Sequence, residues 1–145
     1  MPFLIIISLS FFSYIIESPA QNVSYSVFEE NPELSNSTLY IFTGSDWCAN
    51  CRRLEKNILS DSLFLKTIES NNIEIEIIDF PQRKKLSPEV IKRNESIAEI
   101  YNFQGVFPTL VLSQTKDNFE VLKYKNQAVA EFSELVVEKL KDLNE

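Results

Sequence analysis

Apolar residues in this chain recur at two spacings, which together predict strands and helices along the sequence. Short runs rich in β-branched and aromatic residues favour strands; they cover residues 38–43, 73–80, 109–113 and 119–124, with a looser alternation over 22–30. Apolar positions three and four residues apart favour amphipathic helices; they cover residues 48–59, a stretch after Asp61, and residues 87–102 and 129–143. This order of elements predicts an α/β fold, with a central mixed β-sheet (a parallel core plus an antiparallel hairpin) flanked by helices on both faces.

The helix expected over 87–102 has the clearest boundaries. Ser87 suits the N-cap and Pro88 the first helical position, where a missing N–H costs nothing. Gly105 then falls where the chain has to turn back into a strand. The apolar residues of this helix predict a buried stripe formed by Val90, Ile97 and Tyr101, supported by Ile91 and Ile100.

The N-terminal segment has a different pattern. Residues 3–16 are an apolar run, shorter than the ~20 residues that a membrane-spanning helix needs. Ser18 and Ala20 are small residues at positions −3 and −1 relative to a cleavage site for signal peptidase after Ala20. We therefore expect residues 1–20 to be a signal peptide cleaved after Ala20, and residues 21–145 to be one exported domain, periplasmic or secreted. An uncleaved anchor or a buried strand is the alternative.

Composition narrows the possible functions. The 145 residues suffice for one domain with its own core. The net charge of −7 argues against nucleic-acid binding, because acidic residues outnumber the basic residues that would displace counterions. The chain has no histidine, which excludes Ser-His and Cys-His catalysis as well as histidine-containing zinc sites, and two cysteines cannot close a four-ligand zinc site. We expect no metal and no organic cofactor.

Both cysteines lie in one stretch, Gly-Ser-Asp-Trp-Cys-Ala-Asn-Cys-Arg-Arg-Leu, residues 44–54. This Cys-x-x-Cys pair follows a predicted strand and begins a predicted helix. At a helix start, unpaired N–H groups and the positive end of the dipole favour a thiolate at Cys48. Cys51 lies on the same helical face but deeper, so Cys48 is expected to attack a disulfide and Cys51 to resolve the product.

The residues around the cysteine pair resemble the motifs of a known protein family. Trp-Cys-Ala-Asn-Cys after a strand, followed later by Val106-Phe107-Pro108-Thr109 before another apolar run, resembles the thioredoxin superfamily, and in particular small exported bacterial thioredoxin-like proteins. The match covers residues 38–140. It implies a thioredoxin fold and a monomeric thiol-disulfide oxidoreductase, which meets a membrane only during export and has protein disulfides and an electron donor or acceptor as partners.

The resemblance also implies roles for three neighbours of the catalytic Cys48 and Cys51. Pro108 is expected to follow a cis peptide bond and to pack against the pair, which exposes the Phe107 backbone to an extended substrate. Trp47 is expected to shield the disulfide and to form an apolar rim where substrate docks. Trp47, Phe107 and Pro108 are therefore the predicted substrate-binding residues. Asp46 is expected to lie at the rim and to help start the helix.

Two departures from thioredoxin leave the activity less defined. Phe42 occupies the position where thioredoxin has a buried aspartate that accepts a proton from the resolving thiol. The residues between the cysteines are Ala49 and Asn50 in place of Gly-Pro, so the direction of electron flow does not follow from the resemblance. Two alternatives stay open: a thioredoxin-like binding module for client polypeptides or a soft metal such as Cu(I), and a domain whose bridge is purely structural.

Overall fold

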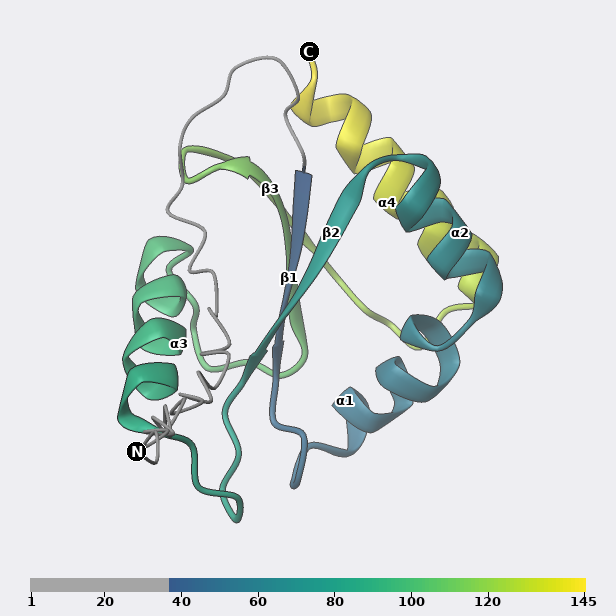
Figure 1. Ribbon diagram of the computed structural model, residues 1–145. Helices are drawn as coiled ribbons and strands as arrows, with labels where there is room; N and C mark the ends of the chain where they lie inside the picture. Colours follow the sequence, from purple (N-terminus) through teal and green to yellow (C-terminus); the bar gives the residue numbers. More distant parts are fainter. Residues whose placement is uncertain (1–36) are drawn as a thin grey trace, which may run out of the picture. The chain divides into compact units, whose positions relative to one another are not determined.

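The computed structural model describes residues 37–145, in which four strands form one sheet (Figure 1). The strands are β1 (Ser37–Thr43), β2 (Ile73–Asp79), β3 (Thr109–Thr115) and β4 (Asn118–Leu122), in the spatial order β2-β1-β3-β4. The helices are α1 (Ala49–Leu54), which continues as the π-helical segment η1 (Glu55–Leu59), then α2 (Ser62–Ser70), α3 (Pro88–Ile100) and α4 (Val129–Leu143). The predicted signal peptide and the predicted strand over 22–30 lie outside the described residues.

The strand pairing confirms the predicted mixed sheet. β1 pairs in parallel with β2 and antiparallel with β3, and β3 and β4 form the hairpin. One expectation changes: the apolar run over 73–80 predicts a core strand, but within residues 37–145 β2 lies at the edge of the sheet and Ile77 is 47% exposed. The strand is apolar because Ile73 and Ile78, which point to opposite faces, are each buried in a different layer.

Helices cover both faces of this sheet, as predicted. Alternation along β1 points Leu39 and Ile41 to the face covered by α2 and α4, and Tyr40 and Phe42 to the face covered by α3 (Figure 1). The first face holds a mostly aliphatic core, to which Phe64 of α2 and Phe132 of α4 also belong. The second face is mostly aromatic. The sheet therefore separates two cores, and the aromatic one extends toward the cysteine loop.

The buried face of α3 differs from the predicted one. Ile97 is half-buried and Tyr101 is buried, as expected, but Val90, Ile91 and Ile100 are exposed. The polar Asn94 is buried instead, because its Nδ2 donates to the carbonyl oxygen of Asp79 (2.8 Å) and so satisfies the end of β2. A buried hydrogen bond, rather than apolar content, sets the orientation of this helix.

Local signals in the sequence define several element ends correctly. Ser87 caps α3, with Pro88 at the first position. Asp61 caps α2 by accepting the Leu63 N–H (2.8 Å). The hairpin is tighter than predicted, since β3 and β4 extend into the residues expected to form its turn. None of the helices between residues 37 and 145 has the length and apolar content that crossing a membrane requires.

Candidate active site

The cysteine pair lies at the connection between the end of β1 and the start of α1. Because β1 and β2 are parallel, both end at the same edge of the sheet, the lower edge in Figure 1. Residues 44–47 form a turn in which Gly44 O accepts the N–H groups of Trp47 (3.2 Å) and Cys48 (2.8 Å). Cys48 is the N-cap of α1 and is joined to Cys51 by a disulfide, with 5.3 Å between their Cα atoms. The predicted pairing of the two sulfurs is confirmed.

The surroundings of Cys48 favour a thiolate when the bridge is reduced. Its Sγ accepts the backbone N–H of Cys51 (3.1 Å) and lies at the positive end of α1. A hydrogen bond donated to a charged sulfur stabilises the charged form, as does the helix dipole. Cys48 is 6% exposed and Cys51 4%, so the predicted difference in exposure has the expected direction but is small. The main difference is that Cys48 precedes the helix whereas Cys51 lies inside it.

Trp47, which precedes the first cysteine, is held by contacts to two other segments. Its Nε1 donates to the carbonyl oxygen of Phe80 (2.9 Å), and its ring meets the ring of Phe107 edge-on, with 5.1 Å between centroids. A Cβ atom on Gly44 would lie 2.4 Å from the Trp47 ring, so glycine is required at that position. The structure thus brings together Trp47 and Phe107, which the sequence predicts to share one site.

The peptide bond between Phe107 and Pro108 is cis, which confirms the expectation drawn from the resemblance. Thr109, the next residue, pairs with Phe42 of β1. Pro108 therefore enters the sheet beside the end of β1, where the cysteine loop begins. Phe107 also contacts Phe103 edge-on, at 5.0 Å between centroids, and Phe103 stacks on Phe42 at 4.5 Å. A chain of aromatic contacts links the proline loop to the core.

Asp46 does not start α1, contrary to the prediction. Its carboxylate accepts three consecutive backbone N–H groups from the connection after β2: Gln82 (2.9 Å), Arg83 (2.7 Å) and Lys84 (2.9 Å). The cap of α1 is Cys48 itself, which leaves Asp46 free to hold this distant loop. The bond from Gln82, followed by those from Lys84 and Arg83, lowers the pKa of Asp46.

Hydrogen bonds between Ser45 and Asp79 form a second link between the cysteine loop and the end of β2, which the sequence did not predict. The N–H of Ser45 donates to Asp79 Oδ1 (2.9 Å), and its Oγ donates to Oδ2 (2.7 Å). Residues 45, 46 and 47 therefore each bond to the segment at the end of β2. Nothing in the spacing signals these bonds, because the partners lie more than 30 positions away.

Known proteins resemble this chain in sequence and in fold. A curated disulfide bond reductase, DsbH of Chlamydia pneumoniae, is 32% identical over 95 residues, which are 66% of this chain and 53% of the relative. A solved structure described as DsbH oxidoreductase matches with a TM-score of 0.66 at 26% identity, over 73% of each chain. The chain is thus similar in sequence and in fold to DsbH proteins, and its four-stranded mixed sheet flanked by helices is a thioredoxin fold.

Three further findings complete the comparison. No protein-family model matches the sequence. The solution structure of a thioredoxin from Thermus thermophilus has a TM-score of 0.43 at 18% identity, over 75% of this chain and 72% of that chain. The chain spans about half the length of the DsbH relative.

The departure from thioredoxin at Phe42 has a structural counterpart. Phe42 is completely buried in the aromatic core, whose other buried members are Tyr40, Ile78, Tyr101 and Val111. A carboxylate at this position would lie in that core, against the ring of Phe103. The position at which thioredoxin has its proton acceptor is therefore part of the hydrophobic core here.

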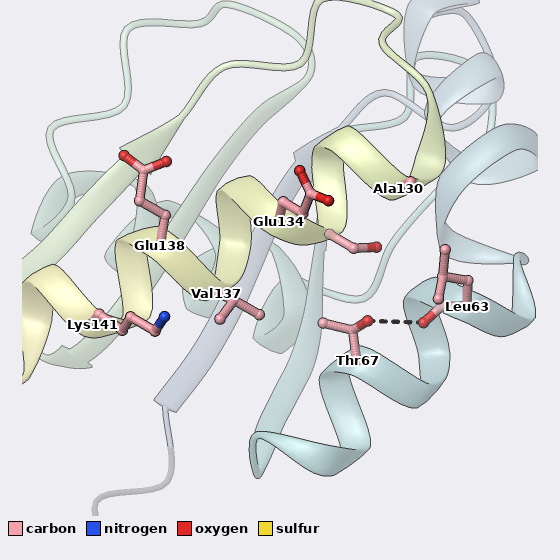
Figure 2. A pocket seen from close by; sticks show the side chains of 8 residues that line it. Leu63, Thr67, Ala130, Glu134, Val137, Glu138 and Lys141 are labelled. Atoms are coloured by element: carbon pink, nitrogen blue, oxygen red, sulfur yellow. Dashed lines mark hydrogen bonds between the residues drawn. The ribbon is translucent and has the colours of Figure 1, made fainter.

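Two surface hollows lie in the described part of the chain. One, of about 440 Å³, lies between α2 and α4 and is lined by residues such as Thr67, Val137 and Glu138 (Figure 2). It has no cysteine and no contact with the disulfide loop. The other, of about 430 Å³, lies between the start of α3 and the connection after β2. Among residues 37–145, no three side chains of the metal-binding types gather into a candidate ion site.

Replacing Asp46 with asparagine is expected to make the fold less sensitive to acid. The folded-state pKa of Asp46 is lowered, so its ionised form stabilises the fold above the unfolded pKa of about 3.9. That contribution is lost as the pH falls through the lower folded pKa. Urea midpoints measured from pH 6 to pH 2 should fall less in D46N than in the wild type. Asp117→Asn in the β3–β4 turn is the control, and equal slopes for wild type and D46N would contradict the assignment.

Proposed function

We propose that this domain is a thiol-disulfide oxidoreductase that exchanges the Cys48–Cys51 pair with disulfides of polypeptide substrates. The observation that carries the proposal is the bridge itself, which joins the N-cap of a helix to a residue inside it. A bridge in that position lets the helix dipole and the Cys51 N–H stabilise a Cys48 thiolate, which lowers the cost of opening the bridge. The similarity to a disulfide bond reductase supports reduction of the substrate as the direction.

The proposed reaction moves two electrons to the substrate in two exchange steps. The Cys48 thiolate attacks one sulfur of the substrate disulfide, whose S–S bond breaks, and the departing substrate sulfur takes up a proton. Cys51 then loses its proton and attacks Cys48 Sγ, so that the mixed disulfide breaks and the second substrate thiol leaves. The Cys48–Cys51 bridge is restored. A separate electron donor has to reduce it before the next cycle.

Trp47, Phe107 and Pro108 are proposed to bind the substrate next to the cysteines. The edge-on contact between Trp47 and Phe107 supports this role, because it brings two apolar rings together at the edge of the sheet where the cysteine loop lies. The cis bond before Pro108 precedes β3, whose first residue pairs with β1. An extended substrate would pair with the backbone of Phe107 there.

Export to an oxidising compartment is the proposed setting. The apolar run over residues 3–16 and the small residues at Ser18 and Ala20 support a leader that is removed after Ala20. In such a compartment a dithiol persists only where a donor keeps it reduced. The mass of the protein recovered after export tests this directly: a mature chain that begins at Gln21 is expected, and a chain that keeps residues 1–20 would contradict cleavage.

Insulin reduction with dithiothreitol tests the activity. Wild-type protein should shorten the delay before reduced insulin B chain precipitates, because it passes electrons from dithiothreitol to the insulin disulfides. The double variant Cys48→Ala/Cys51→Ala, which keeps the surface of the domain, should behave like dithiothreitol alone. Wild-type protein that does not shorten the delay would contradict the proposal.

A further inference from the structure

The charge of this protein is unevenly distributed around the disulfide. The segments that form the edge with the cysteine loop, residues 44–54, 79–86 and 106–109, hold five basic residues and two acidic ones, a net charge of +3. The remainder of the sequence holds nine basic and nineteen acidic residues, a net charge of −10. An acidic polypeptide is thus repelled by most of the chain and attracted near the disulfide.

Most of the positive charge near the disulfide comes from residues 81–86, which we call the basic loop. It contains Arg83, Lys84 and Lys85 in succession, all three exposed. No carboxylate between residues 37 and 145 forms an ion pair with any of them. These three cations are therefore available to a partner.

The basic loop is held close to the cysteines rather than free to move away. The carboxylate of Asp46 accepts the N–H groups of Gln82, Arg83 and Lys84 at 2.9, 2.7 and 2.9 Å. Asp46 precedes Cys48 by two residues, that is by two Cα steps of about 3.8 Å each. Screening acts over about 10 Å at 0.1 M salt and over a longer distance at lower salt, so charges on this loop act most strongly on a substrate bound at the disulfide when the salt concentration is low.

The two carboxylates of these segments, Asp46 and Asp79, are engaged in hydrogen bonds of their own. The loop's N–H groups surround Asp46, and Ser45 donates twice to Asp79. Both carboxylates thus hold the local backbone, and their charge is partly balanced by the donors. The cations have no such partners among the described side chains.

The surface next to the basic loop contains a hollow that a polypeptide segment could enter. It has a volume of about 430 Å³, and Lys84 and Lys85 line it together with Phe80, Leu86 and the exposed Ile91; Asp79 and Glu95 also reach its wall. Apolar residues and two lysines around one hollow suit a segment that carries carboxylates around an apolar side chain.

We propose that the basic loop and its hollow form a docking surface for an acidic segment of the substrate polypeptide, next to the disulfide to be reduced. This inference rests on the proposed oxidoreductase activity. Docking there would raise the rate at which the acidic substrate meets Cys48, and Asp46 would act as the positioning residue that keeps the docking surface beside the cysteines.

Two synthetic peptides test this docking surface. Each is closed by one internal disulfide, and they differ only in flanking residues, three Glu in one and three Gln in the other. Pre-reduced protein is mixed with each peptide, quenched with acid and separated by chromatography, which gives the rate constant for peptide reduction. At 20 mM salt the Glu peptide should react about 5- to 20-fold faster, an effect at the low end of electrostatic steering. At 0.5 M salt, with a Debye length of about 4 Å, the ratio should fall below about 2.

Charge variants locate the effect. Arg83→Gln/Lys84→Gln/Lys85→Gln should bring the ratio to about 1 without slowing the Gln peptide, since the bonds to Asp46 use the loop backbone. Lys66→Gln/Lys116→Gln/Lys141→Gln removes the same charge from α2, the β3–β4 turn and α4, and should keep the wild-type ratio. A wild-type ratio of 1 or less, or a ratio that survives in the loop variant, overturns the docking surface while activity stands. Failure to reduce either peptide overturns the activity and the docking surface together.

Discussion

Cys48→Ala should reduce insulin reduction to the rate of dithiothreitol alone. Cys48 is the N-cap of α1, and its Sγ is the sulfur that accepts the Cys51 N–H. No other side chain in the sequence can replace this thiol, because Cys51 is the only other cysteine and lies inside the helix. The loss should therefore be complete rather than partial.

Cys51→Ala is the matched control for this loss. Both variants lack the bridge, which closes a very short loop and contributes about 2 kcal/mol in the chain-entropy view. Both should stay folded by circular dichroism, with similar urea midpoints. Only Cys51→Ala should still react once with a disulfide, although it should not turn over. Turnover in Cys48→Ala, or a large stability difference between the two variants, would contradict the assigned roles.

Phe42→Ala should lower the free energy of unfolding by about 3–5 kcal/mol, the usual cost of removing a buried aromatic ring. Phe42 is completely buried on the face of β1 that α3 covers, and its ring stacks on Phe103 with 4.5 Å between centroids. Phe103 in turn contacts Phe107 next to the cis-proline. The variant therefore removes both core packing and support for the proline loop. Urea unfolding measures the change.

Ile100→Ala on α3 is the control for Phe42→Ala. Ile100 is an apolar residue that the sequence predicts to be buried, but it is 50% exposed. Its replacement should change the free energy of unfolding by no more than about 0.5 kcal/mol. A cost below about 1 kcal/mol for Phe42→Ala, or a cost for Ile100→Ala as large as that for Phe42→Ala, would show that the aromatic core has been misassigned.

Local patterns account for what could be predicted from the sequence. The apolar run of β1, the Cys-x-x-Cys pair at the start of α1 and the cap at Ser87 each depend on neighbours within a few residues. The cis bond before Pro108 could be predicted only from the family resemblance, because the residues around it do not specify a cis bond. These features already bring the disulfide, Trp47 and Phe107 to one edge of the sheet.

Long-range hydrogen bonds account for what the sequence analysis missed. Asn94 faces the core of the fold because the end of β2 needs a donor, which no apolar pattern reveals. Asp46 looks like a helix-starting residue, yet its three partners lie 36 to 38 positions away. The three basic residues Arg83, Lys84 and Lys85 are exposed, and their attachment beside the cysteines follows only from the folded structure.

The most direct measurement is to trap the reaction halfway. Reduced Cys51→Ala protein is mixed with a disulfide-bonded peptide, and the products are digested and examined by mass spectrometry without reductant. The account predicts one mixed disulfide, between Cys48 and a peptide cysteine, which dithiothreitol releases. In the reciprocal Cys48→Ala variant, Cys51 should form far less mixed disulfide with the peptide. Recovery of no adduct on Cys48, or of an equal amount on Cys51 in the reciprocal variant, would contradict Cys48 as the attacking thiol.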